Sequence, residues 1–344
     1  MVMLNVFDSD AFGVVSLTDA INKIKFVPGR LGQLGLFSES SVNTTQVAIE
    51  EKNGILKLIP PTPRGAPGTT IEKNGRSMLS VTVPHFEVND AVMAEEVQNV
   101  RAFGTENALE TVMSKVGDRL TTATNSLAAT QEYSRIGAMK GLVTYADGSS
   151  LDLFTLFGVT QQSEVDFDLD NASPTSGALR KKCAQVVRLL ANELDGVPFS
   201  GYAIAECGDA FFDDLVAHPE VVASYRNTPM ASVLRDGYLN PATGQKIYGA
   251  FEFGGIIWEN YRGSVGSTTY VNTDKCHIAP MGAPGLFRTY YAPADYEETV
   301  NTMGQRLYAK QYQMPNGKGR NLDTQMNALD ICTRPRTLVQ GKRT

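Results

Sequence analysis

The sequence is poor in the residues that build metal centres and disulfide frameworks. Its 344 residues include three histidines and four cysteines, with no C-x-x-C pair. The histidines lack the i, i+4 spacing of a metal-binding helix. Cys276 is beside His277, but neighbours on a strand point to opposite faces and chelate poorly. We therefore expect no metal site, and we expect reduced, buried thiols at Cys183, Cys207, Cys276 and Cys332.

Long apolar runs and an excess of basic residues are also missing. No run approaches the roughly 20 apolar residues of a membrane span. Residues 1–8 lack a basic segment ahead of an apolar core, so we expect no signal peptide and synthesis in the cytoplasm. The net charge of −6 argues against tight nucleic-acid binding, which needs clustered Lys and Arg. It is compatible with passive enclosure of nucleic acid by a shell.

Catalytic motifs are absent as well. The Gly-Lys pairs at 317–318 and 341–342 are followed by Gly and Arg, so neither supplies the hydroxyl that a P-loop uses to bind magnesium. No G-x-S-x-G elbow occurs. The acidic alternation at 166–171 lacks the glycine and the final glutamate of a calcium loop. The sequence thus predicts no catalytic, cofactor-binding or metal-binding residues.

The most informative feature that is present is a long β-hairpin. Residues 46–59 and 69–83 have strand character. A two-stranded ribbon is marginal in water by itself, so we expect another copy of the chain to cover it. The segment that joins the strands is too rich in Pro and Gly for a helix or an interior strand. This tip is our predicted inter-subunit contact: Pro60, Pro61, Pro63, Arg64, Gly65, Pro67 and Gly68.

A long amphipathic helix follows the hairpin. Apolar residues recur every three or four positions, which places them on one stripe: Leu109, Val112, Val116, Leu120, Ala123 and Leu127. A helix over 105–139 is about 50 Å long at 1.5 Å per residue. Two shorter helices in an all-α layer are the alternative. Upstream, residues 90–102 predict a shorter helix with Asn89 as its N-cap.

The remaining two thirds of the chain mix helices and strands without βαβ regularity, which indicates an α+β fold. Residues 1–45 are either an arm that packs on another surface or an ordinary irregular N-terminus. The predicted elements are a hairpin in 142–157 with 151–154 as its second strand, helices over 173–196, 208–215 and from 218, strands over 200–205, 247–253, 256–258, 275–279, 286–291 and 306–314, and a return strand over 322–331 after a turn at 316–319.

This order of elements resembles the major capsid proteins of tailed bacteriophages, and most nearly the lambda-type family (major capsid protein E). Residues 26–37, Phe-Val-Pro-Gly-Arg-Leu-Gly-Gln-Leu-Gly-Leu-Phe, are similar to the family's arm ahead of the first strand. Residues 140–148 are similar to its hairpin after the long helix. Residues 319–329 resemble its closing segment, where a polar stretch precedes a last apolar strand.

The resemblance implies a phage capsid fold divided along the chain: an N-terminal arm (1–43), an extended β-hairpin loop (44–84), a peripheral domain with the spine helix (85–195), an axial domain (196–300) and C-terminal strands that return to the peripheral domain (301–344). It implies a non-enzymatic virion protein, assembled in the bacterial host cytoplasm into hexamers and pentamers of an icosahedral shell around double-stranded DNA. Portal, scaffold, maturation protease and decoration proteins are the implied partners.

Two other readings stay open from the residues alone. One is a soluble α+β enzyme whose site is assembled from dispersed residues such as Asp209, Asp213 and His218. The long hairpin argues against it, because an enzyme gains little from an exposed ribbon. The other is a different assembly protein, such as a nanocompartment shell or a tail component.

Overall fold

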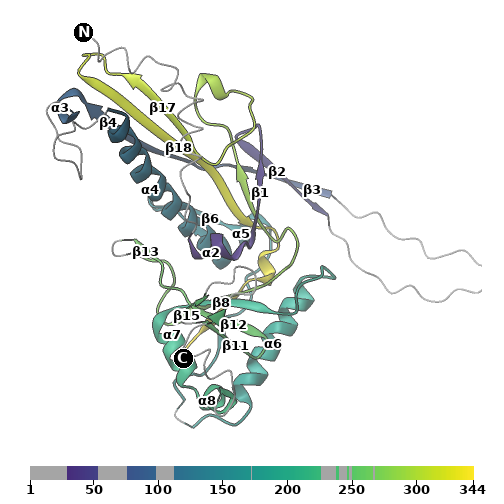
Figure 1. Cartoon of the computed structure of the whole chain (residues 1–344). Coiled ribbons are helices and arrows are strands. Elements are labelled where there is room, and N and C mark those ends of the chain that lie inside the picture. Colours follow the sequence, from purple (N-terminus) through teal and green to yellow (C-terminus); the bar gives the residue numbers. More distant parts are fainter. Residues whose placement is uncertain are drawn as a thin grey trace, which may run out of the picture.

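The chain folds into two lobes, an elongated one and a more compact one that contains the C-terminus (Figure 1). The computed structural model describes residues 29–52, 76–97, 112–171, 173–225, 238–239, 246–247, 250–265 and 268–344. Helices and strands are interleaved along the chain, so the predicted α+β class is confirmed. Within these residues, none of the helices combines the length and the apolar character needed to span a bilayer.

The elongated lobe is built on a five-stranded sheet whose central strand is β18 (Gly319–Cys332). β18 pairs antiparallel with three strands, whereas β1 pairs parallel with β16, so that Phe37 lies opposite Phe287. The turn predicted at 316–319 is confirmed, since it joins β17 to β18. The other strands of the sheet are β1 (Phe37–Ser41), β4 (His85–Met93), β16 (Phe287–Tyr291) and β17 (Tyr308–Gln313).

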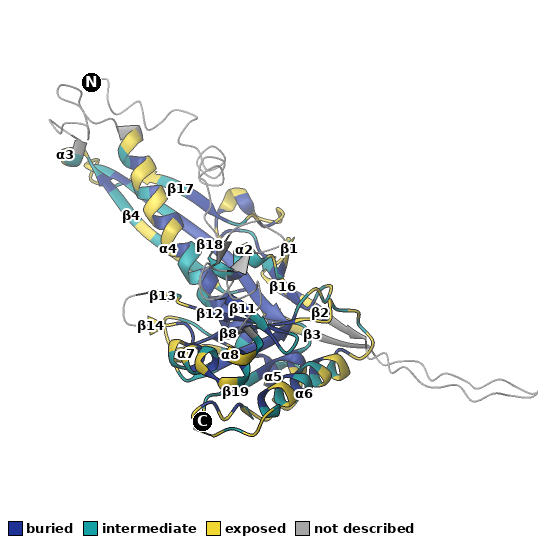
Figure 2. Ribbon diagram, turned by 60° about the horizontal axis from the view of Figure 1, so that its bottom comes forward, coloured by how far each residue is buried: buried dark blue, intermediate teal, exposed yellow. Residues whose placement is uncertain are grey.

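The long predicted helix is α4 (Val112–Lys140), which packs against this sheet. Its stripe is confirmed where it is described: Val116, Leu120 and Leu127 are buried in one cluster with Leu322 and other sheet residues. The outer side of α4 is exposed, whereas the central strand β18 beneath it is largely buried (Figure 2). Gly141 ends the helix at φ 81°, in the left-handed region that favours glycine. Positions 105–111 lie outside the described residues.

The base of the predicted hairpin is confirmed. β2 (Gln46–Lys52) and β3 (Arg76–Thr82) pair antiparallel, with Gln46 opposite Thr82. Val47, Ile49 and Val81 are buried in the core that the two lobes share. Residues 53–75 lie outside the described residues, and so do all the predicted tip residues from 60 to 68. The tip contact therefore stays a prediction.

The compact lobe has a six-stranded sheet in the order β11-β12-β8-β15-β19-β7. α6 (Ala178–Glu193) and α7 (Asp209–Ala217) share a core with one face of this sheet, around Trp258, while α8 (Pro219–Tyr225) packs beside α7. The strands are β7 (Val165–Asp166), β8 (Ala203–Cys207), β11 (Ala250–Phe253), β12 (Ile256–Asn260), β15 (Lys275–Pro280) and β19 (Val339–Lys342).

The other elements are short, and they include the confirmed hairpin after α4. All four cysteines are buried and free, as the sequence predicted. The short elements are α2 (Arg30–Leu34), α3 (Ala94–Val97), β5 (Leu142–Thr144), β6 (Ser150–Asp152), α5 (Leu153–Leu156), β9 (Tyr238–Leu239), β10 (Lys246–Ile247), β13 (Ser264–Val265), β14 (Thr268–Thr269) and the 3-10 turns Glu297–Thr299 and Pro335–Thr337.

Three predicted boundaries are wrong, one because of a distant strand and two because of local cap residues. Residues 90–93 belong to β4 instead of a helix, because β18 supplies a ladder in which Asp90 faces Leu322. The second strand of the hairpin stops at Asp152, whose carboxylate accepts hydrogen bonds from the amides of Phe154 and Thr155 and starts α5. α6 begins at Ala178 and not at 173, after Gly177 in the left-handed conformation.

Candidate functional site at the junction of the lobes

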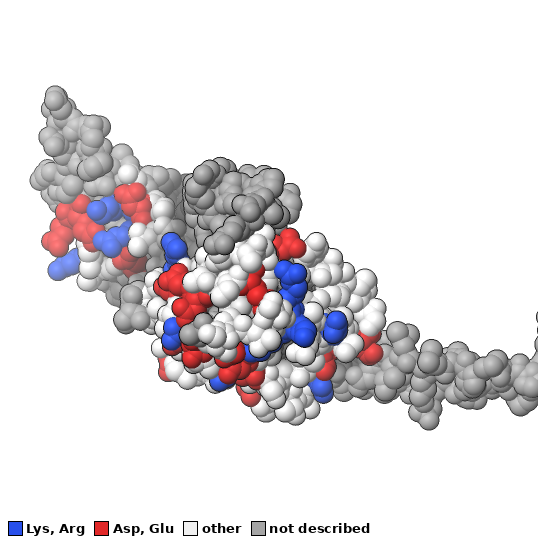
Figure 3. Space-filling model, turned by 90° about the horizontal axis from the view of Figure 1, so that it is seen from below, with Lys and Arg blue, Asp and Glu red and all other residues white. Residues whose placement is uncertain are grey.

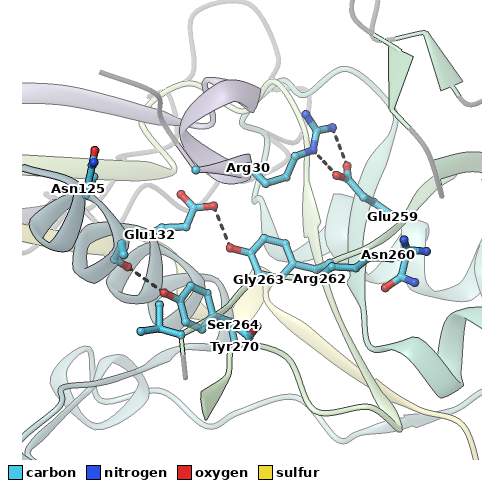
Figure 4. Close-up of a pocket in the computed structure, with 14 residues that line it drawn as sticks. Arg30, Asn125, Glu132, Glu259, Asn260, Arg262, Gly263, Ser264 and Tyr270 are labelled. Atoms are coloured by element: carbon cyan, nitrogen blue, oxygen red, sulfur yellow. Dashed lines mark hydrogen bonds and ion pairs between the residues drawn. The ribbon is translucent and has the colours of Figure 1, made fainter. Parts of the chain in front are cut away.

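The short helix α2 lies where the two lobes meet (Figure 1). The Arg30 guanidinium binds the Glu259 carboxylate of β12 through two hydrogen bonds, of which Nη2 to Oε2 measures 2.7 Å. Figure 4 shows this pair facing the junction. Glu259 is buried, so its charge needs a partner of this kind. Arg30 therefore connects α2 to the sheet of the compact lobe.

Glu132 of α4 holds the other side of α2. Its Oε1 accepts hydrogen bonds from the Leu31 amide at 2.7 Å and from the Tyr261 hydroxyl at 2.9 Å. Its Oε2 lies 3.4 Å from the Gly32 amide. The first amides of a helix have no partner within the helix, and a carboxylate satisfies both them and the positive end of the helix dipole. α2 is thus bound to both lobes through charged groups.

A cavity of about 470 Å³ lies beside α2. Its lining comes from α4, from the segment after β12 and from Tyr270, whose hydroxyl donates to the Ala129 carbonyl at 3.2 Å. Arg30, Glu132 and Glu259 make the contacts described above, whereas Oδ1 of Asn260, which also lines the cavity, is buried without a hydrogen-bond partner among the described residues. In the part of the chain that the structure describes, no three His, Cys, Asp or Glu side chains are grouped to hold a metal ion.

A row of polar residues crosses the compact lobe's sheet next to α2. Glu206 of β8 is opposite Glu259 on one side and opposite His277 of β15 on the other, and His277 is opposite Gln340 of β19. Burial, followed by the nearby Glu259 charge, raises the pKa of Glu206 well above its usual range. Burial, followed by the charge of Lys140, lowers the pKa of His277 to about 3. Burial therefore favours the neutral form of both side chains.

A second buried charge pair stabilises the elongated lobe. Arg135 of α4 donates to Asp330 of β18 at 3.4 Å and to Glu39 of β1 at 2.7 Å. The Thr289 hydroxyl of β16 donates to the same Asp330 carboxylate at 2.5 Å. Burial disfavours the charge on Arg135, but Asp330 and other neighbours outweigh it, so the pKa of Arg135 is raised. One guanidinium thus connects the helix to strands from both ends of the chain.

The dispersed residues considered for an enzyme do not form a site. Asp209 and Asp213 are exposed one turn apart on α7. His218 is buried after the end of that helix, where Nδ1 accepts a hydrogen bond from the Glu220 amide at 3.2 Å and burial lowers the pKa of the ring. This is a capping arrangement. The three residues do not line the junction cavity.

Sequence reasoning missed the residues of the junction, although a signal was present. Glu206 and Glu259 each interrupt an apolar strand, in Ile204-Ala-Glu-Cys207 and Ile257-Trp-Glu-Asn260. A carboxylate inside such a run is rarely fully buried unless it is paired, which indicated a buried partner; Glu259 has one in Arg30, whereas Glu206 has none among the described residues. The identity of that partner was not readable, because Arg30 is 229 residues away from Glu259.

We expect Glu132→Ala to lower the free energy of unfolding by about 2 kcal/mol, since it leaves the Leu31 amide and the Tyr261 hydroxyl without an acceptor. Denaturant-induced unfolding measures the change. Glu95→Ala is the control, because Glu95 is exposed on α3 and we expect a change within about 0.5 kcal/mol there. Equal stability of the two variants would contradict the role of Glu132.

Comparisons with known proteins agree with this architecture. The family model described as phage major capsid protein E matches residues 13–343. The major capsid protein of Pseudomonas phage KPP10 is 29% identical over 345 residues, with 96% of this chain and 97% of that protein covered. The major capsid protein of Salmonella phage Felix O1 is 25% identical over 362 residues, with 98% of each covered.

The fold is shared with solved capsid structures. The putative capsid protein of a prophage of E. coli CFT073 superposes with a TM-score of 0.56 at 12% identity, covering 96% of this chain and 99% of that one. At this identity the likeness shows the fold alone. Because the family model spans nearly the whole chain, the protein belongs to the phage major capsid protein E family.

Proposed function

We propose that this chain assembles into the pentamers and hexamers of an icosahedral phage head that encloses double-stranded DNA. The observation that carries the proposal is the family match over residues 13–343. Family and fold support a structural role in the virion capsid, and we extend this to a subunit without catalytic activity. Assembly in the bacterial host cytoplasm, and the participation of a portal, a scaffold, a maturation protease and decoration proteins, belong to the same proposal.

The proposed division of labour follows the chain. Residues 1–43 serve as an arm, 44–84 as the extended loop, 85–195 as the peripheral domain with α4 as its spine, 196–300 as the axial domain, and 301–344 as returning strands. The lobes interleave these ranges. α6 from within 85–195 and β19 from within 301–344 pack in the compact lobe with β8 and β12. Because each lobe contains segments from distant parts of the same chain, we expect the two lobes to fold together.

The region around the hairpin base has features of a contact surface. A cavity of about 710 Å³ is lined by residues 41–48 and by Met303. Met303 is 59% exposed and Val300 is 64% exposed, which is high for large apolar side chains. Apolar surface that is buried between copies stabilises a shell by roughly 25 cal/mol per Å², and closed shells repeat each contact by symmetry. These features support a loop that covers a neighbouring subunit.

The charge distribution suits a container better than a DNA-binding protein. Acidic and basic side chains lie close to one another on the face shown in Figure 3, with uncharged surface around them. The whole chain carries a net charge of −6. Tight binding to phosphates needs clustered cations, so such a subunit would enclose DNA without binding it tightly.

Electron microscopy and light scattering of the purified protein test the proposal. We expect closed shells, or discrete pentamers and hexamers. A monomer or small dimer that forms no particles, even when the phage's other head proteins are co-expressed, would contradict it. That outcome would favour the enzyme reading and justify a substrate screen.

Deleting residues 61–67 tests the proposed tip contact. We expect the subunit to stay folded but to form no shells, because the deletion shortens the loop without touching the described core. Electron microscopy scores the particles, and circular dichroism with a thermal transition is the control for folding. Normal particles from the deletion variant would refute the contact.

A further inference from the structure

The buried row described above lies on the face of the compact lobe's sheet that points toward the other lobe. Alternate residues of a strand point to opposite faces. Ile204, two residues before Glu206, belongs to the core shared by both lobes, and Ala203, Ala205 and Cys207 belong to the core around Trp258. Glu206 therefore points into the junction.

Glu206 has no hydrogen-bond partner there. It is fully buried, and neither of its carboxyl oxygens is paired among the described residues. An ionised carboxylate taken out of water without donors loses several kcal/mol of hydration, so the group binds a proton instead. Among the described residues, the two cations of this region hydrogen-bond other groups: Arg30 pairs with Glu259, and Lys140 donates to the Tyr270 carbonyl.

We propose that Glu206 is a proton-controlled latch of the lobe junction, neutral while the junction is closed and ionised when the junction opens to water. Opening releases one proton from Glu206 to the solvent. A closed junction then holds one carboxylate, Glu259, against one guanidinium, Arg30. A charged Glu206 would place a second negative charge in the same site, and none of the described residues offers it a paired cation.

Several other charged or titratable groups face Glu206 from the elements packed around it. They are Glu259 of β12, His277 of β15, Arg30 of α2, Glu132 of α4 and Tyr261 after β12. The three carboxyl groups repel one another, and Arg30 offsets one charge. Burial, followed by the charge of Glu132, raises the pKa of Tyr261, which keeps the phenol neutral and able to donate to Glu132.

The effect of Glu206 on the stability of the closed junction can be separated, by its pH range, from the effects of neighbouring titratable groups. The pKa of Glu206 is raised above its ordinary 4.5, so the closed junction is favoured at low pH and weakens as pH rises above that value. His277, with its pKa lowered from 6.5 to about 3, weakens the closed state only as pH falls below 6.5. Lys140, with its pKa lowered from 10.5 to about 8, acts only above that pH. Well inside the interval from pH 6.5 to 8, neither His277 nor Lys140 accounts for a change in the closed state.

Hydrogen exchange of the full-length protein tests the latch. The Leu31 and Gly32 amides report opening, because they bind Glu132 only while α2 is seated. After correction for the intrinsic rate, we expect their protection to fall as pH rises from 6.5 to 8 in the wild type, by at most about tenfold per pH unit for the one proton released. We expect Glu206→Gln, a neutral isostere, to remove this slope. Glu95→Gln is the matched control and should keep it.

The same slope in Glu206→Gln and in the wild type would overturn the proposal. If Glu206→Gln does not fold, Arg30→Met serves instead. Without the guanidinium, the charge that lowers the pKa of Glu206 is lost, so the fall in protection should extend to higher pH than in the wild type. An unchanged pH profile in Arg30→Met would then overturn it. Neither result depends on shell assembly, so the latch can fail while the proposed capsid function stands.

Discussion

Val116→Asp is expected to prevent folding. Val116 is 2% exposed and lies between α4 and the sheet of the elongated lobe, in a cluster with Leu120 and Leu322. An aspartate at this position would bury an unpaired charge, for which the cost exceeds the stability margin of many domains, on the order of 5 kcal/mol or more. Circular dichroism and solubility measure the outcome.

The matched control for this variant is Thr121→Asp on the same helix. Thr121 is exposed, so the same new charge is hydrated there and we expect a change within about 0.5 kcal/mol. Unchanged dichroism and solubility of Val116→Asp would mean that the stripe is not buried.

Arg135→Met is expected to lower the free energy of unfolding by about 3–5 kcal/mol, because removing one partner leaves a buried charge uncompensated. Asp330 is fully buried, and Arg135 is the cation that pairs with it among the described residues. The Thr289 hydroxyl would then remain as a hydrogen-bond donor to the carboxylate. Denaturant-induced unfolding gives the free energy.

The double variant Arg135→Met/Asp330→Asn is the control for the charge itself. Replacing both partners removes the stranded carboxylate, so we expect the double variant to recover part of the lost stability. A loss below about 1 kcal/mol in Arg135→Met would show that the pair contributes no more than a surface ion pair.

Much of the fold was predictable because it depends on residues that are close to one another in the sequence. The stripe of α4 follows from a spacing of three and four residues, and the hairpin after α4 from Asp147-Gly148. The start of α7 after Gly208 was predicted correctly in the same way. These signals act over a few residues, and the structure did not override them.

The candidate site was less predictable. The sequence singled out the hairpin tip at 60–68, which lies outside the described residues, and it offered no residue of the lobe junction. Arg30 looked like part of an arm or an irregular terminus. It pairs instead with Glu259, and Glu132 meets the amides of the same short helix. Partners so distant along the chain leave no local pattern.

The sequence by itself determined the α+β class, the order of the elements, the resemblance to phage capsid proteins and the apolar face of the spine helix, since each depends on local periodicity, turn residues or element order. Only the tertiary structure decided that residues 90–93 form a strand, because β18 supplies their hydrogen-bonding partner. Register alone placed Glu259, Glu206 and His277 in one buried row. Strand register depends on contacts between distant segments, and in this chain the register of β8, β12 and β15 brings the buried titratable groups together.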